Sequence, residues 1–236
     1  MCYYYFMENI SLLKRYANEI GVNINEKQAQ QFALFYDAVV ASNKLFNLTA
    51  IVEGKEFIVK HIIDSVAGIS EIPNGAYVCD IGAGAGFPSM PIAIMRQDVN
   101  VLAIDSTAKK MNFLANCAKE IGINNLKTKA GRAEEMTAMF EKFDVVVARA
   151  VSSLQILLEL AMPLLKVGGK FVAYKTDESE IEVSKNAQKT LFAKHVATKS
   201  FALPNGDRRA IITFEKLQKT PQQYPRQYGT IKKKPL

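Results

Sequence analysis

Hydrophobic and polar positions follow two different patterns along the chain. Up to residue 46, apolar side chains such as Leu12, Tyr16 and Ile20 recur every three or four positions, which is the spacing of amphipathic helices. Asn25 precedes a second run of this kind as a candidate N-cap, and a third helix is predicted over residues 55–70. We therefore predict that residues 1–72 form a helical extension packed on the rest of the protein.

From residue 76 the pattern changes to short apolar runs that alternate with helical ones. Such alternation is typical of a mostly parallel, doubly wound α/β sheet. The last two runs are joined only by the turn PNGD, so one strand is expected to enter antiparallel. The predicted strands are AYVCDIGA (76–83), VNVLAID (99–105), NLKTKAG (125–131), FDVVVARA (143–150), GGKFVAYK (168–175), VATKSFAL (196–203) and RRAIITFEK (208–216).

Helices are predicted between most of these strands, over residues 87–96, 106–122, 152–165 and 178–193. The α/β domain then covers residues 73–216. The remaining segment, 217–236, is polar, basic and contains proline, so it is expected to be an extended or flexible tail.

Composition limits the classes of protein to consider. The chain has 236 residues and a net charge of +7, from 30 Lys and Arg against 23 Asp and Glu. This charge favours a polyanionic partner such as nucleic acid, although a merely basic surface explains it equally well. No apolar run approaches the roughly 18 residues of a membrane span. The start lacks the pattern of a signal peptide, and Met7 is an alternative start that would leave Met1–Phe6 as an upstream extension.

Cysteine and histidine are few and scattered. The three cysteines, Cys2, Cys79 and Cys117, form no CxxC pair, and the two histidines, His61 and His195, stand far apart. A disulfide framework or a metal site is therefore not expected, and a reducing cytoplasm is the expected location.

The stretch VCDIGAGAGFPSMPIAI carries the first candidate chemistry. Its glycines, Gly82, Gly84 and Gly86, follow a predicted strand at alternate positions. Glycines there let a ligand lie against bare backbone. The dinucleotide fingerprint is G-x-G-x-x-G, whereas here the third glycine comes one position early and Phe87-Pro88 would crowd a pyrophosphate. The spacing favours a ligand without phosphates, and the alternative is an ordinary tight turn of an α/β protein.

Asp105 ends the second predicted strand. A carboxylate at this point can accept hydrogen bonds from both ribose hydroxyls of an adenosine. Alternatively, it caps the following helix. Both NAD and S-adenosylmethionine carry a ribose, so Asp105 does not distinguish them, but the glycine spacing favours S-adenosylmethionine.

Taken together, several motifs are similar to one bacterial family. DIGAGAGFPSMPIAI, NKLFNLTAI, HIIDS, GRAEE, VVARAV and the ending YPRQYGTIKKKPL resemble the methyltransferases that modify a guanine N7 in small-subunit (16S) ribosomal RNA, also called the glucose-inhibited division protein B family. The matches run from about Asn43 to the C-terminus. The resemblance implies a seven-stranded, Rossmann-like S-adenosylmethionine-dependent methyltransferase fold. It also implies that the partner is small-subunit ribosomal RNA or its ribonucleoprotein. A cytoplasmic enzyme without a membrane partner is expected from the composition, and a monomer is predicted.

The resemblance also implies which residues form the site. Glu134 would accept the adenine amino group, with a charge at a helix N-terminus as the alternative. Arg149 would hold the methionine carboxylate or the RNA backbone, and for His61 a core or surface histidine remains the alternative. The resemblance implies cofactor contacts for Gly82, Phe87, Ala133, Glu134 and Arg149, and substrate-side positions for Asn47, Thr49, His61 and Asp64. Together with the loop and strand-end residues, the predicted cofactor set is Asp80, Gly82, Gly84, Gly86, Phe87, Asp105, Ala133, Glu134 and Arg149, and Arg149 is also a substrate-side candidate.

Guanine N7 carries a lone pair and no proton, so it can attack a sulfonium methyl directly. Such an enzyme needs alignment rather than a general base, and the sequence offers no Ser-His-Asp set, no carboxylate pair and no metal cluster. The target base has to be exposed from its stack first. The candidate RNA-binding residues are Lys109, Lys110, Arg132, Arg208, Arg209, Arg226, Lys232, Lys233 and Lys234, although a solvated chain end explains the tail lysines equally well.

Two other functions remain open from the sequence. One is an NAD-dependent oxidoreductase, against which Phe87 and the lack of a Tyr-x-x-x-Lys pair argue. The other is a non-catalytic RNA-binding protein, against which the complete glycine loop and Asp105 argue.

Overall fold

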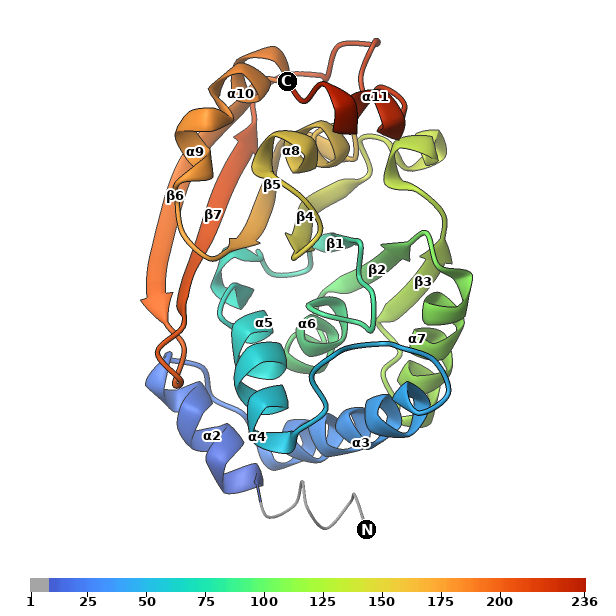
Figure 1. Cartoon of the computed structure of the whole chain (residues 1–236), viewed down its shortest axis with the longest axis vertical. Helices are drawn as coiled ribbons and strands as arrows, with labels where there is room; N and C mark the ends of the chain where they lie inside the picture. Colours follow the sequence, from blue (N-terminus) through green and yellow to red (C-terminus); the bar gives the residue numbers. More distant parts are fainter. Residues whose placement is uncertain (1–8) are drawn as a thin grey trace.

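Seven strands form one sheet in the order β3-β2-β1-β4-β5-β7-β6 (Figure 1). The computed structural model describes residues 9–236, so the alternative start at Met7 lies outside the described residues. Pairing is parallel from β3 to β5, and β7 is antiparallel to both β5 and β6, which confirms the predicted mixed sheet. The strands are β1 Tyr77–Ile81, β2 Asn100–Asp105, β3 Leu126–Ala130, β4 Phe143–Arg149, β5 Leu165–Lys175, β6 Ala193–Ala202 and β7 Arg208–Lys216.

The strand order reverses between β1 and β4, which are neighbours in the sheet. Asp80 of β1 pairs with Ala103 of β2 on one side and with Val147 of β4 on the other. Chain segments that leave the carboxyl ends of β1 and β4 therefore diverge in opposite directions. Ligands of doubly wound sheets bind at this point.

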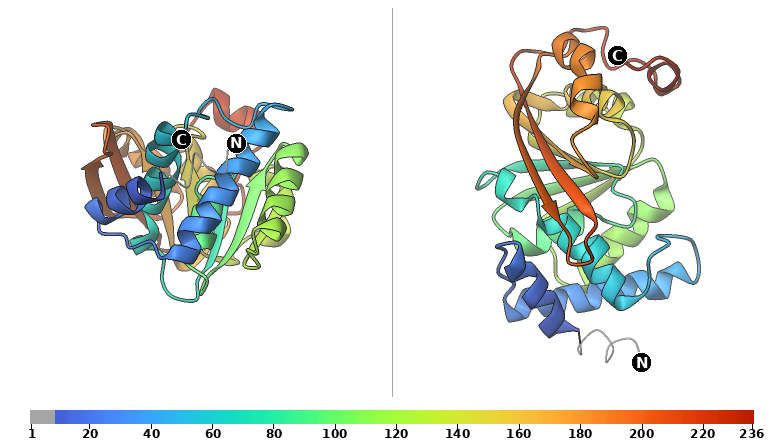
Figure 2. Two further views of the ribbon diagram at one scale, coloured as in Figure 1. Left: turned by 90° about the horizontal axis from the view of Figure 1, so that it is seen from below. Right: turned by 60° about the vertical axis from the view of Figure 1, so that its left-hand side comes forward.

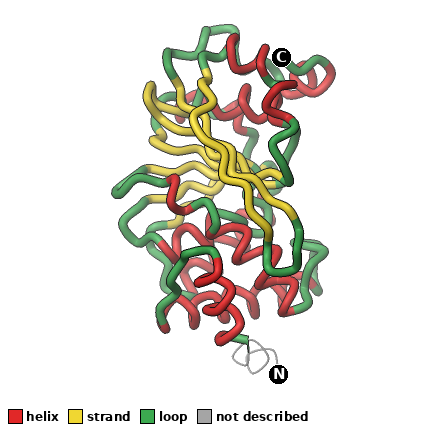
Figure 3. Tube along the Cα trace, turned by 90° about the vertical axis from the view of Figure 1, so that its left-hand side faces the viewer, coloured by secondary structure: helices red, strands yellow, loops and turns green. Residues whose placement is uncertain are grey.

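Helices cover both faces of the sheet, with a separate hydrophobic core on each (Figure 3). Alternate strand residues divide between the cores: Val78 faces one, whereas Cys79 and Ile81 face the other. The first face carries α2 Ile10–Glu19, α3 Glu26–Asn43, α4 Gly54–Phe57, α5 Asp64–Val66, α6 Ser89–Met95 and α7 Ala108–Glu120. The second carries α8 Leu154–Ala161, α9 Glu180–Val183, α10 Lys185–Thr190 and α11 Tyr228–Lys233.

The N-terminal helices share their core with α6 and α7. Asn25 caps α3 in a reciprocal capping box with Gln28, and Phe32 and Phe35 of this helix are fully buried. Seen from below, α3 lies across the molecule with α7 on one side and α2 on the other (Figure 2). The boundaries of the extension, 1–72, and of the α/β domain, 73–216, stay predictions.

The predicted third helix is continuous but not uniform. Between α4 and α5, residues Ile58–Ile63 form a π-helix (η1). A π segment shifts the helical phase by one residue, and such segments are frequent at functional sites. Here it carries Lys60 and His61.

The tail departs from its prediction as an extended or flexible segment. It contains α11, Ile231 is fully buried, and the Arg226 guanidinium pairs with the Glu159 carboxylate of α8 at 2.6 Å. The side chain of Glu159 is itself fully buried, and a buried charge requires a partner. The tail is ordered because it supplies that partner, an interaction between distant positions that the polarity of the tail does not reveal.

Candidate functional site

Two cavities open at the carboxyl edge of the sheet. The first, about 400 Å³, is bounded by the loops that follow β1, β2, β3 and β4, and we call it the loop cavity. The second, about 470 Å³, lies between η1, the ends of β4 and β5 and the start of β7, and we call it the charged cavity. Both are lined by Ala150, the residue after β4. The two cavities therefore adjoin at the reversal of strand order.

The three glycines of the loop after β1 have different roles. A Cβ on Gly82 would lie 2.6 Å from Val151 Cγ2, and one on Gly86 would lie 2.5 Å from Leu114 Cδ1, so both positions are closely packed. Gly84, with φ of +56°, would place a Cβ no closer than 3.9 Å to its nearest neighbour, the Gly82 carbonyl oxygen. Because Gly84 lines the loop cavity, its missing side chain leaves room for a ligand.

The Asp105 carboxylate accepts backbone hydrogen bonds from two neighbouring loops, and its predicted role at a ribose stays a prediction. One carboxylate oxygen accepts the Gly84 N–H at 3.0 Å, and the other accepts the N–H of Thr107, the N-cap of α7, at 2.8 Å. The carboxylate also lines the loop cavity. Each carboxylate oxygen can accept a further hydrogen bond, so Asp105 can hold the glycine loop and still receive ligand hydroxyls.

Glu134 provides the test of whether a ligand fits. Its Oε1 is buried and has no hydrogen-bond partner, and Arg132 Nη1 at 3.9 Å is too distant to donate one. A buried, unpaired acceptor is costly unless a ligand satisfies it. Glu134 and Ala133 both line the loop cavity. An adenosine, with donors on its adenine and its ribose, fits the acceptors of Glu134 and Asp105.

Arg149 organises the charged cavity from the end of β4. Its guanidinium donates to the Lys60 carbonyl at 2.7 Å, to Asp64 Oδ2 at 3.0 Å and to His61 Nδ1 at 3.1 Å. Arg209 at the start of β7 approaches the other oxygen of Asp64 at 3.2 Å. The cluster joins three distant segments of the chain, and all its members line the charged cavity.

His61 is neutral in this network. Burial, followed by the positive charge of Arg149, lowers the pKa of His61 to about 3. Since Arg149 donates to Nδ1, the proton of the ring is assigned to Nε2, which lies 2.8 Å from Thr49 Oγ1. The imidazole stacks on Phe87 with 4.3 Å between ring centroids. Both ring nitrogens are engaged, so His61 has no free acceptor for a substrate proton.

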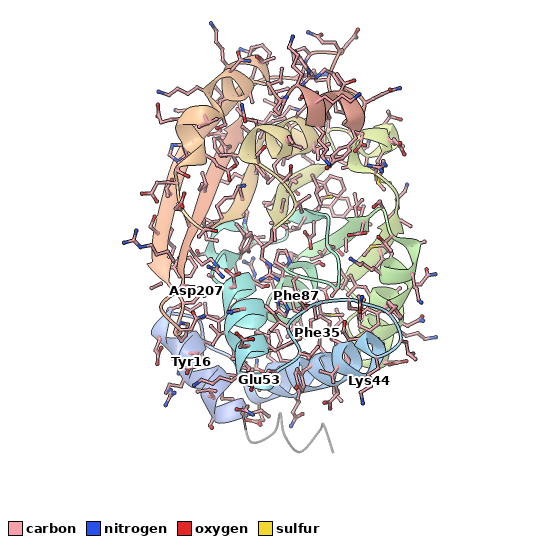
Figure 4. All side chains as sticks on the ribbon, viewed as in Figure 1. Tyr16, Phe35, Lys44, Glu53, Phe87 and Asp207 are labelled. Carbon is pink, nitrogen blue, oxygen red and sulfur yellow. The ribbon has the colours of Figure 1, made fainter. Side chains whose placement is uncertain are left out.

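Three residues predicted to bind the cofactor do not line the loop cavity, and their role at the cofactor stays a prediction. Phe87 is buried at the centre of the molecule, 5.2 Å from the Phe35 ring (Figure 4). Asp80 is fully buried, one of its oxygens accepts the Ser89 N–H at 3.0 Å, and burial raises its pKa to about 7. Like Gly86, neither of them lines the loop cavity. Of the predicted cofactor residues, those that line it are Gly82, Gly84, Asp105, Ala133 and Glu134.

The predicted RNA-binding residues fall into three groups. Lys110 and Arg132 line the loop cavity, and Arg209 lines the charged cavity. Arg226 donates to Glu159 through its guanidinium and its backbone N–H and so anchors the tail, and its contact with RNA stays a prediction. The third group is exposed to solvent and consists of Arg208, Lys109 and Lys232–Lys234. On the predicted substrate side, Asn47 is exposed as well.

Sequence reasoning missed several site residues. Lys175 ends β5 and donates to the Ser152 carbonyl at 2.8 Å and to Glu180 Oε1 at 2.7 Å, at one side of the charged cavity. The sequence could have indicated Lys175, because it is a charged residue at the carboxyl end of a predicted strand, as Arg149 is. Tyr228 of α11 lines the loop cavity, and only the fold reveals this.

None of the helices in the described part of the chain combines the length and apolar composition of a membrane span. Among residues 9–236, no group of three or more His, Cys, Asp or Glu side chains is arranged as metal ligands would be.

Comparison with known proteins gives consistent matches. The sequence profile of the family described as rRNA small subunit methyltransferase G matches residues 28–212. A ribosomal RNA small subunit methyltransferase G from Streptococcus pyogenes serotype M1 is 43% identical over 230 residues, covering 94% of this chain and 97% of that protein.

Solved structures share the fold at low sequence identity. The TYW2 protein of M. jannaschii, in complex with AdoMet, aligns with a TM-score of 0.54 at 18% identity, over 66% of this chain and 76% of that one. A SAM dependent methyltransferase from Aquifex aeolicus aligns with a TM-score of 0.53 at 17% identity, over 65% and 90% of the two chains. These likenesses show the fold alone, a doubly wound methyltransferase sheet, as predicted.

Proposed function

This chain belongs to the family of ribosomal RNA small subunit methyltransferase G, and we propose that it methylates N7 of one guanine in small-subunit ribosomal RNA. It is an S-adenosylmethionine-dependent methyltransferase. The observation that carries the proposal is the pair of adjoining cavities. The loop cavity offers the acceptors that an adenosine needs, and the charged cavity beside it is of a size and polarity for a purine base.

In the loop cavity, Asp105 and Glu134 are the residues that would hold the ribose and the adenine. The methyl group of S-adenosylmethionine is bonded to a positively charged sulfur, so a nucleophile with a free lone pair accepts it as the carbon–sulfur bond breaks. The missing side chain of Gly84 leaves space for the cofactor beside the loop. The hydrogen bond from the Gly84 N–H to the Asp105 carboxylate holds the loop in this conformation.

A general base is absent from the proposed mechanism because N7 of guanine loses no proton when it accepts a methyl group. The local groups agree with this chemistry. His61 keeps a neutral ring whose two nitrogens are engaged by Arg149 and Thr49, so it cannot take up a proton from the substrate. The contribution of the residues is then alignment of two reactants, which can lower a barrier by roughly 7–11 kcal/mol.

The charged cavity is compatible with a guanine base. Its lining includes donors, among them Lys175 and Arg209, and acceptors, among them Asp177 and Glu180. A guanine presents both kinds of edge group, since O6 accepts a hydrogen bond while N1 and N2 donate. Arg149, held by Asp64 and His61, is proposed to line the junction of the two cavities, where the base meets the methyl donor.

Binding of the RNA backbone is proposed for the exposed basic residues, Arg208, Lys109 and Lys232–Lys234. Contacts of this kind fix position without reading sequence, whereas the charged cavity selects the base. Small-subunit ribosomal RNA or its ribonucleoprotein is the proposed partner. That the enzyme acts as a monomer stays a prediction.

The test is a transfer assay with methyl-labelled S-adenosylmethionine. Small subunits and naked 16S RNA, both from cells that lack the enzyme, are incubated with wild-type protein and digested to nucleosides. The proposal expects label only in 7-methylguanosine, at one methyl group per RNA molecule, in at least one of the two substrates. Label in another nucleoside, or at another atom of guanine, would overturn it. The Asp105→Ala variant, expected to bind the cofactor poorly, is the matched control.

A further inference from the structure

The C-terminal segment contributes an aromatic wall to the loop cavity. Tyr228 is the first residue of α11 and lines this cavity together with Asp105, Arg132 and Glu134. It is the one aromatic side chain among the described residues that line it. The Arg132 guanidinium lies over the Tyr228 ring at 5.2 Å from its centroid, a cation–π distance. The ring and the guanidinium therefore form one continuous wall.

We propose that Tyr228 is a cofactor-binding residue and that the segment 224–236 completes the site. The inference deepens the proposed function, because it rests on an adenosine occupying the loop cavity. Apart from Arg132, the lining residues beside Glu134 along the chain are small, Gly131 and Ala133, and the other segments contribute aliphatic and polar side chains. A purine ring gains most from a planar aromatic neighbour. Tyr228 supplies such a surface in the same cavity as the unpaired acceptor of Glu134.

Tight anchoring on both sides of Tyr228 supports the inference. Before it, Arg226 donates to Glu159 through its backbone N–H at 3.0 Å, Nε at 2.8 Å and Nη2 at 2.6 Å. After it, Ile231 is fully buried in the core beneath α8, and the Leu236 carbonyl oxygen accepts Gln155 Nε2 at 2.8 Å. Such anchors fix the position of the tyrosine ring.

The helix that receives the anchors also borders the cavity. Glu159 precedes Leu160, and Leu160 lines the loop cavity. Figure 1 shows α11 lying beside α8 over the second face of the sheet, close to the loop that follows β3. The Arg226–Glu159 pair thus ties the tail to the wall of the cavity itself. Loss of this pair should weaken cofactor binding through Tyr228, although Arg226 does not line the cavity.

The first experiment compares four proteins by calorimetry with S-adenosylhomocysteine. Tyr228→Ala is expected to raise the dissociation constant about tenfold, the scale of stacking between a base and an aromatic side chain. Tyr228→Phe, which keeps the ring, should stay within about twofold of wild type on the same reasoning. Thr230→Ala, an exposed position on the same helix, is the matched control and should not change binding. Equal affinity of Tyr228→Ala and wild type would overturn the inference.

A second measurement uses the fact that the chain has no tryptophan. Tyr228→Trp gives a single fluorophore at the proposed wall, and its emission should change in a saturable way as S-adenosylhomocysteine is added. Adding Arg226→Ala to this variant should reduce the affinity and shift the emission of the free protein toward that of exposed tryptophan. An emission unaffected by the ligand, in a protein that calorimetry shows to bind it, would contradict the inference.

The two proposals fail in different ways. If wild-type protein does not bind S-adenosylhomocysteine, the cofactor assignment itself is wrong. If wild type binds it and methylates ribosomal RNA, while Tyr228→Ala binds equally well, only the role of Tyr228 is wrong.

Discussion

Gly84→Val is the sharpest test of where the cofactor lies. At φ of +56° the new residue would adopt a left-handed backbone conformation, which costs an L-residue roughly 1–2 kcal/mol of stability. The space around the new Cβ is open, since its nearest neighbour is the Gly82 carbonyl oxygen at 3.9 Å. The protein should therefore fold, with an unfolding free energy lowered by about that amount.

Cofactor binding should suffer much more than folding. The branched side chain would occupy space at the edge of the loop cavity, and the N–H of Gly84 is held by Asp105 at 3.0 Å, so the loop cannot easily retreat. Overpacking of a well-fitted site costs about 1–3 kcal/mol. We expect the dissociation constant for S-adenosylhomocysteine to rise roughly 10- to 100-fold.

Gly122→Val is the matched control for strain. Gly122 has φ of +74°, and an added Cβ there meets no atom within 4 Å, but it lies after α7 and away from both cavities. Urea denaturation should show similar destabilisation of the two variants, whereas calorimetry should show weakened binding only for Gly84→Val. Normal affinity in a folded Gly84→Val protein, or equal weakening in both variants, would refute the placement of the cofactor.

Three further predictions concern other parts of the site. Asp105→Ala should weaken binding of S-adenosylhomocysteine by roughly 1.5–3 kcal/mol, the scale of hydrogen bonds to a charged acceptor. A dissociation constant that calorimetry finds unchanged would mean that Asp105 bonds only to the protein backbone and not to the cofactor. Replacing Lys232–Lys234 with alanine should lower RNA affinity and reduce the slope of log affinity against log salt by about 0.7–0.9 for each phosphate that the variant no longer binds. Filter binding at several salt concentrations measures this slope. Identical slopes for wild type and variant would mean that these lysines are solvated and do not contact RNA. Because burial and Arg149 lower the pKa of His61 to about 3, the unfolded chain binds a proton that the native imidazole does not. Native stability should then fall below pH 6.5 by up to about 1.4 kcal/mol per pH unit relative to His61→Gln, and parallel pH profiles in urea denaturation would contradict this.

The amino-acid sequence by itself determined the architecture and one of the two cavities. Apolar runs and their alternation with helical patterns are local signals, and β1 to β7 form where they indicate, except that β5 and β6 begin three residues earlier, at Leu165 and Ala193. Parallel pairing brings the carboxyl ends of β1 and β2 to one edge, so Gly84 and Asp105 could be placed together without knowledge of the fold. The motif GRAEE led to Ala133 and Glu134 through family resemblance, and both line the loop cavity.

Tertiary structure alone decided which loop residues face the cavity. Gly82, Gly84 and Gly86 alternate regularly in the sequence, yet only the neighbouring side chains reveal that Gly86 is packed against Leu114. Asp80 precedes the glycines on β1, and alternation along the strand turns its side chain to the opposite face from Ile81, which lines the loop cavity. Sequence adjacency says nothing of such packing.

The charged cavity and the tail were likewise decided by long-range contacts. Arg149 meets His61 and Asp64 because a π-helix from the extension lies against the end of β4. Glu159 looks like any polar position on a helix until the fold buries it, and the cost of an uncompensated buried charge then draws in Arg226 and orders the tail. Periodicity and composition describe residues that are close together in the sequence. Burial depends on which distant segments pack together, and burial of a charged side chain then requires that it be paired.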